Sequence, residues 1–314
     1  MRPRFVADPV RVRTPATSAN LGPGFDSLGL ALSLYDEVTA RVVPSGCRIT
    51  VTGEGAGELP EGEEHLLIRA MRATFEVLGG QPPGLEVDCV NRIPQARGLG
   101  SSSSAIVAGV QLARTLVANG GREVDAGAAL RIAAAIEGHP DNVAPCLLGG
   151  FTIAWTDASG ARAVSLRPAG EIEPTVFVPR ERGLTATARA ALPASVPHAD
   201  AAHSAGRAAL LAHALTRDPA LLFPATEDRL HQHYRAVGMP ATADLVSALR
   251  AAGVAAVVSG AGPAVLALSA PPADLDPGME WAVHRLSVDV AGAVAVRGRL
   301  GHAERDPVAA GRKS

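Results

Sequence analysis

Hydrophobic and polar positions alternate with two different periods along this chain, and each change of period predicts a change of element. Alternating or β-branched apolar positions predict strands at 10–12, 38–43, 48–52, 85–90, 151–155, 175–178, 254–259 and 264–268. Apolar positions at helical spacing predict helices over 66–78, which Gly79 closes, and over 106–117. Asp125 can cap an alanine-rich helix that ends at Glu137, and residues 20–26 and 138–145 are interpreted as polar loops.

The pattern restarts after about Ser165 with a further strand, a helical region and two more strands. A chain of 314 residues is long enough to form two domains, each with a core of its own. We therefore expect an α+β protein with an N-terminal domain over 1–160, a C-terminal domain over 161–298 and a polar tail over 299–314.

Composition and charge narrow the class of protein. Hydrophobic residues make up 47% of the chain and charged residues 19%, which is typical of a globular protein. A formal net charge of −2 gives no reason to expect nucleic acid or a membrane as a partner, and no apolar run approaches ~18 residues. The three cysteines are far apart and the first residues hold no apolar signal sequence, so we expect a cytoplasmic protein with reduced thiols.

The most distinctive segment is 97–104, in which two glycines are followed by four serines. It joins the predicted strand 85–90 to the predicted helix 106–117, and a glycine-rich turn that opens a helix presents free N–H groups to a phosphate. The alternative is a flexible linker whose serine caps the helix. The only lysine is Lys313, so the segment is not a Walker A loop, and it also lacks the Gly-x-Gly-x-x-Gly of dinucleotide sites. A bound nucleotide would be neutralised by Mg²⁺, arginine and backbone amides.

Three segments, 14–26, 94–104 and 259–265, together resemble the GHMP kinases, a family of small-molecule kinases. The middle segment matches the family's Pro-x3-Gly-Leu-Gly-Ser-Ser phosphate loop. Within the family, residues 14–26 and 137–145 are similar to the homoserine kinases. The Pro-Gly-Lys start of mevalonate kinases and the Asn-Leu-Ile-Gly-Glu-His signature of galactokinases are both missing.

The resemblance implies a ribosomal-S5-like N-terminal domain, a ferredoxin-like C-terminal domain and an active site between them. It implies phosphorylation of the side-chain hydroxyl of L-homoserine by Mg²⁺ and ATP, giving O-phospho-L-homoserine for threonine biosynthesis, by an enzyme that is commonly a homodimer. Two other functions stay open: a GHMP kinase for another small molecule, and a non-catalytic regulator that binds a nucleotide or an amino acid. The regulator is disfavoured because the loop glycines, Ser102 and Glu137 are all kept.

The resemblance also implies which residues bind the substrate, a zwitterion that needs partners of both charges. Asp26 corresponds to the family's ammonium-binding carboxylate, with Asn20 beside it. The substrate's carboxylate would be bound by two arginines, because the forked guanidinium group matches its two oxygens. The implied substrate-binding set is Asn20, Asp26, His139, Thr185, Arg189 and Arg235. Without the resemblance, the arginines would be interpreted as solvated surface charges and Asp26 as a turn residue.

The resemblance also implies which residues bind the nucleotide, which hold the metal and which take part in catalysis. Ser102 and Glu137 correspond to Mg²⁺ ligands, and two suffice because Mg²⁺ also takes phosphate oxygens and waters. The implied catalytic residues are Arg189 and Asn142, and Asn142 stands where mevalonate kinase-like relatives carry a catalytic aspartate. An asparagine cannot be a base, so the hydroxyl proton would pass to a phosphate oxygen, with Asp141 as the alternative base. The implied nucleotide-binding residues are Pro94, Gln95, Ala96, Arg97, Gly98, Leu99, Gly100, Ser101, Ser102, Ser103 and Ser104.

Two histidine-containing segments need separate interpretation. Relatives often carry Asn-Leu-Ile ahead of their first long helix, where adenine binds, and this chain has His65-Leu-Leu instead. His231 and His233 are two residues apart, and we interpret them as part of an exposed helix face and not as a metal-binding pair.

Overall fold

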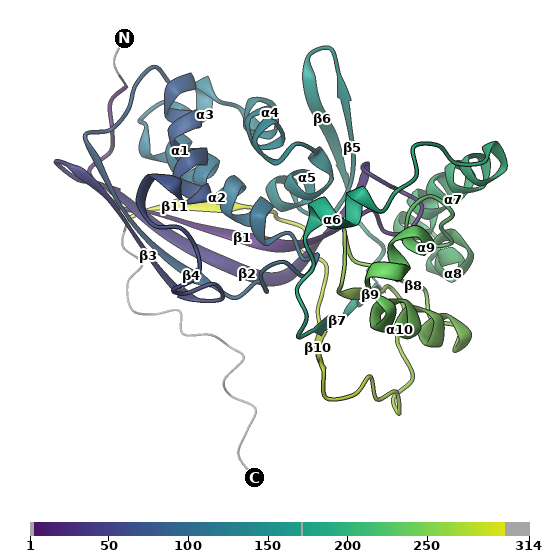
Figure 1. The fold of residues 1–314 in the computed structure, drawn as a ribbon. Helices are drawn as coiled ribbons and strands as arrows, with labels where there is room; N and C mark the ends of the chain where they lie inside the picture. Colours follow the sequence, from purple (N-terminus) through teal and green to yellow (C-terminus); the bar gives the residue numbers. More distant parts are fainter. Residues whose placement is uncertain (1–2, 171, 299–314) are drawn as a thin grey trace.

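The computed structural model describes residues 3–170 and 172–298, which form two sheets with helices packed against them (Figure 1). The strands of the first sheet are β1 (Val10–Ala19), β2 (Leu28–Val42), β3 (Gly46–Gly53), β4 (Gly84–Asn91), β5 (Phe151–Asp157), β6 (Gly160–Leu166) and β11 (Val294–Arg297). The strands of the second sheet are β7 (Thr175–Pro179), β8 (Ala256–Val258), β9 (Val265–Ala267) and β10 (Trp281–Arg285).

The helices fall into two groups along the chain. Those that belong with the first sheet are η1 (Gly62–Glu64), α1 (Leu66–Val77), α2 (Ser101–Leu116), α3 (Gly120–Glu123), α4 (Ala126–Glu137) and α5 (Pro140–Leu148). Those that lie between β7 and β8 are α6 (Thr185–Ala190), α7 (His198–Thr216), η2 (Pro219–Leu221), α8 (Leu222–Ala225), α9 (Gln232–Arg235), η3 (Ala236–Gly238) and α10 (Pro240–Ala251).

The first sheet has the strand order β11-β1-β2-β4-β3, and the β5–β6 hairpin extends it through β2. Its pairs are antiparallel except for β3 and β4, which run parallel. Figure 1 shows α1, α2, α4 and α5 over one face of this sheet. Val10, Val12, Val38 and Val87 point into the core with these helices, because alternate residues of a strand share a face.

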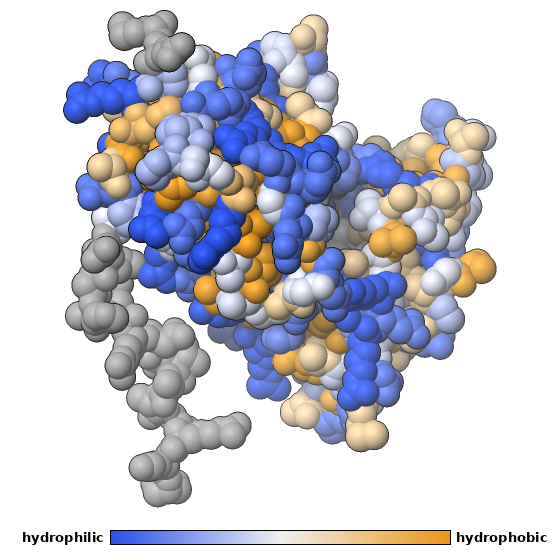
Figure 2. All heavy atoms as spheres, turned by 60° about the vertical axis from the view of Figure 1, so that its left-hand side comes forward, coloured by the Kyte–Doolittle hydropathy of each residue, from blue (hydrophilic) through white to orange (hydrophobic). Residues whose placement is uncertain are grey.

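The second sheet has the antiparallel order β10-β7-β9-β8. This order fits the expected ferredoxin-like domain, but a loop over 268–280 stands where that pattern has its second crossover helix. A separate core cluster that includes Leu30, Phe151, Val176 and Leu266 joins the two sheets. Figure 2 shows one outer face of the molecule, where hydrophobic and hydrophilic residues are interspersed.

Several predicted elements differ from the structure. The segment 138–145, interpreted as a loop, forms most of α5, because Pro140 suits the first position of a helix and Val143, Ala144 and Cys146 are buried against the core. The last two predicted strands shorten to the three residues of β8 and of β9.

Sheet membership does not follow the expected division of the chain at residue 160. β6 lies beyond that point and pairs with β5 in the first sheet, while β11, from the far end of the described chain, pairs with β1. The expected polar tail, 299–314, lies outside the described residues. No helix of the described ranges is both long enough and apolar enough to cross a membrane.

Candidate active site

A cleft of about 480 Å³ opens beside the N-terminus of α2, and residues from both halves of the chain line it. It brings together all six residues of the predicted substrate-binding set, and also Ser102, Glu137 and Asn142. Of the predicted nucleotide-binding segment, seven residues line the cleft: Gln95, Ala96, Gly98, Gly100, Ser101, Ser102 and Ser104. The cleft wall does not include the other four: Pro94, Arg97, Leu99 and Ser103.

Gly98 and Gly100 shape the loop that precedes α2. Both have a positive φ, of 77° and 70°, which an L side chain rarely adopts. A Cβ on Gly98 would lie 2.2 Å from the Ser259 carbonyl oxygen, and one on Gly100 would lie 1.9 Å from Thr17 Oγ1. The glycines are therefore needed for packing within the protein, in addition to the close approach of phosphate that the sequence suggested.

The loop is held by the second half of the chain. Ser259 Oγ donates to the Gly98 carbonyl over 2.7 Å, and the Ala264 N–H donates to the Arg97 carbonyl over 3.1 Å. The Arg97 guanidinium donates to the carbonyls of Gln95, Pro179 and Arg180, so this arginine braces the loop. The free N–H groups at the start of α2 are thus fixed in place before any ligand arrives.

Glu137 connects the end of α4 to the start of α2. Ser102 Oγ donates to its Oε2 over 2.8 Å, and Ser103 Oγ donates to its Oε1 over 3.0 Å. A carboxylate at a helix C-terminus opposes the helix dipole, and the two serine hydroxyls compensate for that. Ser102 is exposed to the cleft and Ser103 is buried beneath it. Hydroxyl and carboxylate oxygens are the ligands that Mg²⁺ prefers, so Ser102 and Glu137 fit this ion.

Asp36, which the sequence analysis missed, contacts the first turn of α2. It is buried and accepts the N–H groups of Arg92 and Ile93 and the hydroxyl of Ser104. Burial raises the pKa of the Asp36 carboxyl, and the hydrogen bonds from Ile93, Arg92 and Ser104 oppose that shift. In the sequence Asp36 is followed directly by a second acidic residue, Glu37, and no local pattern shows which of the two is buried.

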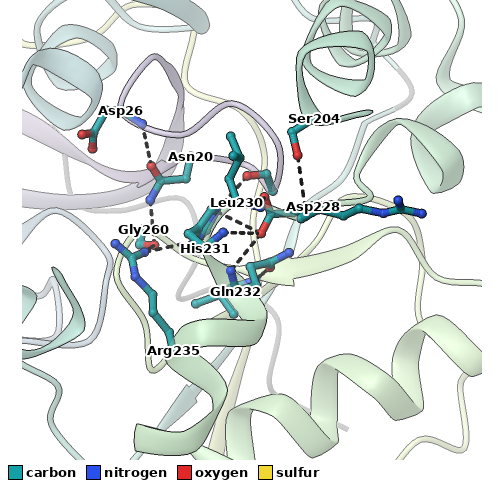
Figure 3. A network of polar contacts seen from close by, with 12 residues as sticks. Asn20, Asp26, Ser204, Asp228, Leu230, His231, Gln232, Arg235 and Gly260 are labelled. Carbon is teal, nitrogen blue, oxygen red and sulfur yellow. Dashed lines mark hydrogen bonds and ion pairs between the residues drawn. The ribbon is translucent and has the colours of Figure 1, made fainter. Parts of the chain in front are cut away.

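Asp26 and Arg189 form a bidentate ion pair in the cleft, with nitrogen–oxygen distances of 2.6 and 3.0 Å. Figure 3 shows Asn20 between Asp26 and Gly260: its Oδ1 accepts the Asp26 N–H, and its Nδ2 donates to the Gly260 carbonyl. Asn20 and Asp26 both have a positive φ, which the turn between β1 and β2 imposes. The charges predicted for the two ends of a zwitterion are therefore adjacent and neutralise each other.

Arg235 is almost completely buried, with 2% of its surface exposed, so it is no solvated surface charge. Its guanidinium donates to the Gly260 carbonyl and to His231 Nδ1 (Figure 3). It also donates to the Ala188 carbonyl. His231 is fully buried, and its Nε2 donates to the Gly22 carbonyl. The interpretation of His231 as part of an exposed face is wrong, because its ring packs behind Arg235, and His233 alone is exposed.

His139, Asp141 and Asn142 occupy the start of α5. His139 Nδ1 lies 2.6 Å from Asp141 Oδ1, and this hydrogen bond raises the pKa of His139 against the opposing effect of burial. Thr17 Oγ1 donates to Asn142 Oδ1 over 2.9 Å. Since its oxygen is occupied, Asn142 has its amide N–H groups left to offer to a ligand. Thr17 was missed by the sequence analysis, although it lies within the segment 14–26.

Comparisons with known proteins agree with this geometry. The family model of the GHMP kinases N terminal domain matches residues 65–150, and that of the GHMP kinases C terminal domain matches residues 200–277. The chain is 57% identical over 298 residues to homoserine kinase of Streptomyces coelicolor, covering 94% of this chain and 96% of that protein. It is 59% identical over 296 residues to homoserine kinase of Streptomyces avermitilis, covering 93% and 97%.

Solved structures of more distantly related proteins also match this chain. The crystal structure of homoserine kinase from Cytophaga hutchinsonii matches with a TM-score of 0.81 and 28% identity, over 93% of this chain and 99% of that one. A mevalonate kinase of L. major matches with a TM-score of 0.66 at 14% identity, over 91% and 98%, which shows a shared fold.

Proposed function

We propose roles for the side chains of this cleft from one premise: the chain belongs to the homoserine kinases, a branch of the GHMP kinase family. Its reaction is the ATP-dependent phosphorylation of the side-chain hydroxyl of L-homoserine, which gives ADP and O-phospho-L-homoserine on the route to threonine. One observation carries the assignment of this reaction to the cleft. Partners for both charges of a zwitterion and the N-terminus of a helix, which favours phosphate, line the same cavity.

The amino-acid end of L-homoserine binds between Asp26, Arg189 and Arg235. Asp26 takes the ammonium, and the arginines take the carboxylate, so the substrate replaces the ion pair between Asp26 and Arg189 with two new ones. Asn20 accepts the backbone N–H of Asp26 and so holds the turn that carries this carboxylate. His139, which precedes α5, and Thr185, which begins α6, also line the cleft and contact the substrate. We also assign to Arg189 the stabilisation of negative charge that develops on the transferring group, because its side chain is 38% exposed and lines the cleft.

The triphosphate of ATP lies over the loop before α2, with its negative charge at the free N–H groups of the first turn. Ser102 and Glu137 hold Mg²⁺, which neutralises and orients the phosphates when it is bound. Ser103, which donates to Glu137 Oε1, would keep that carboxylate oriented toward the ion.

Phosphoryl transfer proceeds without a protein base. The homoserine hydroxyl oxygen attacks the γ-phosphorus, the bond from that phosphorus to the ADP oxygen breaks, and the hydroxyl proton passes to a phosphoryl oxygen. Asn142 donates its amide N–H to the reacting oxygens, since Thr17 occupies its carbonyl. Asp141 stays bonded to His139 and orients it, which makes the alternative of Asp141 as the base less favoured.

Release of ADP tests the whole proposal. We expect purified protein with Mg²⁺ and ATP to release ADP in the presence of L-homoserine, and far less with mevalonate or galactose. Arg235→Ala, prepared in the same way, serves as the control for a contaminating kinase and loses the homoserine-dependent rate. Turnover of mevalonate at an equal or greater rate would contradict the proposal. That the enzyme is cytoplasmic stays a prediction from its sequence, and that it is a homodimer stays a prediction from the family.

A further inference from the structure

Phe25 directly precedes Asp26 in the chain, and its aromatic ring lies next to both arginines of the substrate-binding set. The central carbon of the Arg235 guanidinium is 5.4 Å from the centre of the ring, and that of Arg189 is 5.7 Å from it. Both distances are within the range over which an aromatic face attracts a cation. Phe25 is half-buried and is not part of the cleft lining, so its ring is placed to act on the arginines and not directly on a ligand.

Arg235 is a buried cation that has no carboxylate within ion-pair distance among the described residues. Only 2% of its surface is exposed. Its hydrogen bonds go to neutral groups: Nε donates to the Ala188 carbonyl, and Nη1 donates to the Gly260 carbonyl and to His231 Nδ1. Burial and the charge of Arg189 lower the pKa of Arg235, and more distant carboxylates oppose this shift. A guanidinium in such a place needs a further stabilising contact.

An aromatic face is suited to this need because it stabilises positive charge without occupying an N–H group. Nη2 of Arg235 has no hydrogen-bond partner within the described part of the chain, so its N–H groups are left for a ligand. A protein carboxylate at the place of the Phe25 ring would take these N–H groups and would compete with the carboxylate of the substrate. The ring leaves them free.

The ring also lies beside the second arginine, whose charge has the same sign. Arg189 is paired with Asp26 in the free protein. When the substrate replaces that ion pair, Asp26 turns to the ammonium, and two guanidinium groups must face one carboxylate. An aromatic face within about 6 Å of both guanidinium groups partly offsets their mutual repulsion.

The position of the ring is itself fixed from two sides. The rings of Phe25 and His231 are stacked, with their centres 5.2 Å apart and their planes inclined by 36°. His231 is fully buried, and its Nε2 bonds to the Gly22 carbonyl. On the other side, Asn20 holds the turn through the N–H of Asp26. The ring is therefore a fixed support for the two arginines.

We propose that Phe25 is a positioning residue, whose ring holds Arg189 and Arg235 in place for the substrate's carboxylate and leaves their N–H groups free to bind it. This inference rests on the proposed function, because it takes the two arginines as the carboxylate site. If the ring only filled space beside His231, the electron density of its face would not matter to the substrate. That difference can be measured.

Fluorination of the ring tests the proposal, because each fluorine draws electron density from the ring face while the size of the side chain hardly changes. Phe25 is replaced by phenylalanine with one, two or three fluorine atoms on the ring. ADP release is then measured over a titration of L-homoserine at saturating Mg²⁺ and ATP. We expect KM for homoserine to rise with each fluorine and to reach about tenfold with three. The value of kcat should change by less than about threefold, because the ring touches neither reacting group.

The matched control is Phe177, which is buried in β7 and has no arginine over its ring among the described residues. The same three replacements there should leave KM for homoserine unchanged, and KM for ATP should stay constant in both series. Phe25→Leu, which has no aromatic face, should raise KM for homoserine at least as much as three fluorines do. Should this variant fail to fold, the fluorinated series still decides.

The proposal is overturned if KM for homoserine is the same throughout the Phe25 series, or if Phe25→Leu folds and leaves this KM unchanged. Wild-type ADP release with homoserine alongside a flat series would remove only the role of Phe25. Absence of homoserine-dependent ADP release in the wild type would remove the proposed function as well.

Discussion

Asp26 and Arg189 satisfy each other's charge while the cleft is free of substrate, and this decides which ligands can enter. The two side chains are 37% and 38% exposed, so water screens the pair and its net strength is modest. A zwitterion can replace the contact between these two side chains, because it offers an ammonium to Asp26 and a carboxylate to Arg189. A ligand with one charge leaves the other protein charge without a partner. The pair therefore acts as a filter for zwitterions.

The variant Asp26→Asn tests this filter with two substrates, L-homoserine and 4-hydroxybutyrate, which lacks the amino group. We expect kcat/KM for homoserine to fall by roughly tenfold to a hundredfold, because the ammonium loses its partner. For 4-hydroxybutyrate, kcat/KM should change by less than about threefold, since the freed Arg189 compensates for the change.

The control for this experiment is Asp157→Asn, which removes the carboxylate of an exposed ion pair with Arg162, and neither residue lines the cleft. It should leave both substrates unaffected, and KM for ATP should stay constant in both variants. Equal losses for the two substrates in Asp26→Asn would show that Asp26 has only a structural role in its turn.

The residues of the site differ in how far the sequence could predict them. Asp26, Arg189 and Arg235 were placed by resemblance to a family, and they line one cleft as expected. Their mutual bonds were beyond prediction, because the pairing of Arg189 with Asp26 joins positions 163 residues apart. The burial of His231 was missed for the same reason: it depends on the Gly22 carbonyl, 209 residues away.

At the scale of elements, the site is built where helix ends meet. The N-terminus of α2, the C-terminus of α4 and the N-terminus of α5 all contribute to the cleft wall. Local signals predicted α4 and most of α2, because their apolar spacing is regular and Asp125 caps α4 as expected. The start of α2 was missed, since its first turn consists of the serines from Ser101 onward. They failed for α5, since the polar residues at its start mask a helix that is stabilised by burial of its later residues.

The contact between α2 and α4 leads to a prediction about the metal. Ser102→Ala and Glu137→Gln should each lower kcat by on the order of a hundredfold, because each removes an oxygen that helps to hold the ion. The Mg²⁺ concentration for half-maximal rate should rise as well. The measurement is ADP release over a titration of Mg²⁺ at saturating ATP.

The neighbouring Ser103 is the matched control, because it donates to the same carboxylate but is buried and outside the cleft lining. Ser103→Ala should lower kcat by less than about tenfold, since Glu137 loses only an orienting hydrogen bond. If Ser103→Ala is as damaging as Ser102→Ala, both hydroxyls act only by orienting Glu137, and Ser102 is not a metal ligand.

At the scale of the whole molecule, the cleft exists because the two sheets are locked together at the phosphate loop. The turn 259–262, from the second half of the chain, packs so closely on Gly98 that no side chain fits between them. Ser259 bonds to that glycine's carbonyl and also to Ser18 of β1. The sequence indicated both glycine-rich segments, but no local pattern shows that the two segments pack on each other.

Gly98→Ala tests how much this contact contributes. The new methyl group would overlap the Ser259 carbonyl and lie 2.9 Å from the Gly262 carbonyl, and a backbone cannot move aside as a flexible side chain can. Gly253→Ala is the matched control, because Gly253 has a similar φ of +80° but no atom within 4 Å of the place that a methyl group would take. The control should lower the free energy of unfolding by about 1–2 kcal/mol, the penalty of a left-handed alanine. Gly98→Ala should lower it by at least about 2 kcal/mol more, through overpacking.

Urea unfolding of both variants measures this difference, and ADP release measures its consequence for the site. Because the displaced loop carries the N–H groups that face the triphosphate, Gly98→Ala should also raise KM for ATP, whereas Gly253→Ala should not. Equal destabilisation by the two substitutions, with ATP binding intact in both, would mean that the loop and the 259–262 turn can separate freely. The two halves of the chain would then form the cleft without being locked at Gly98.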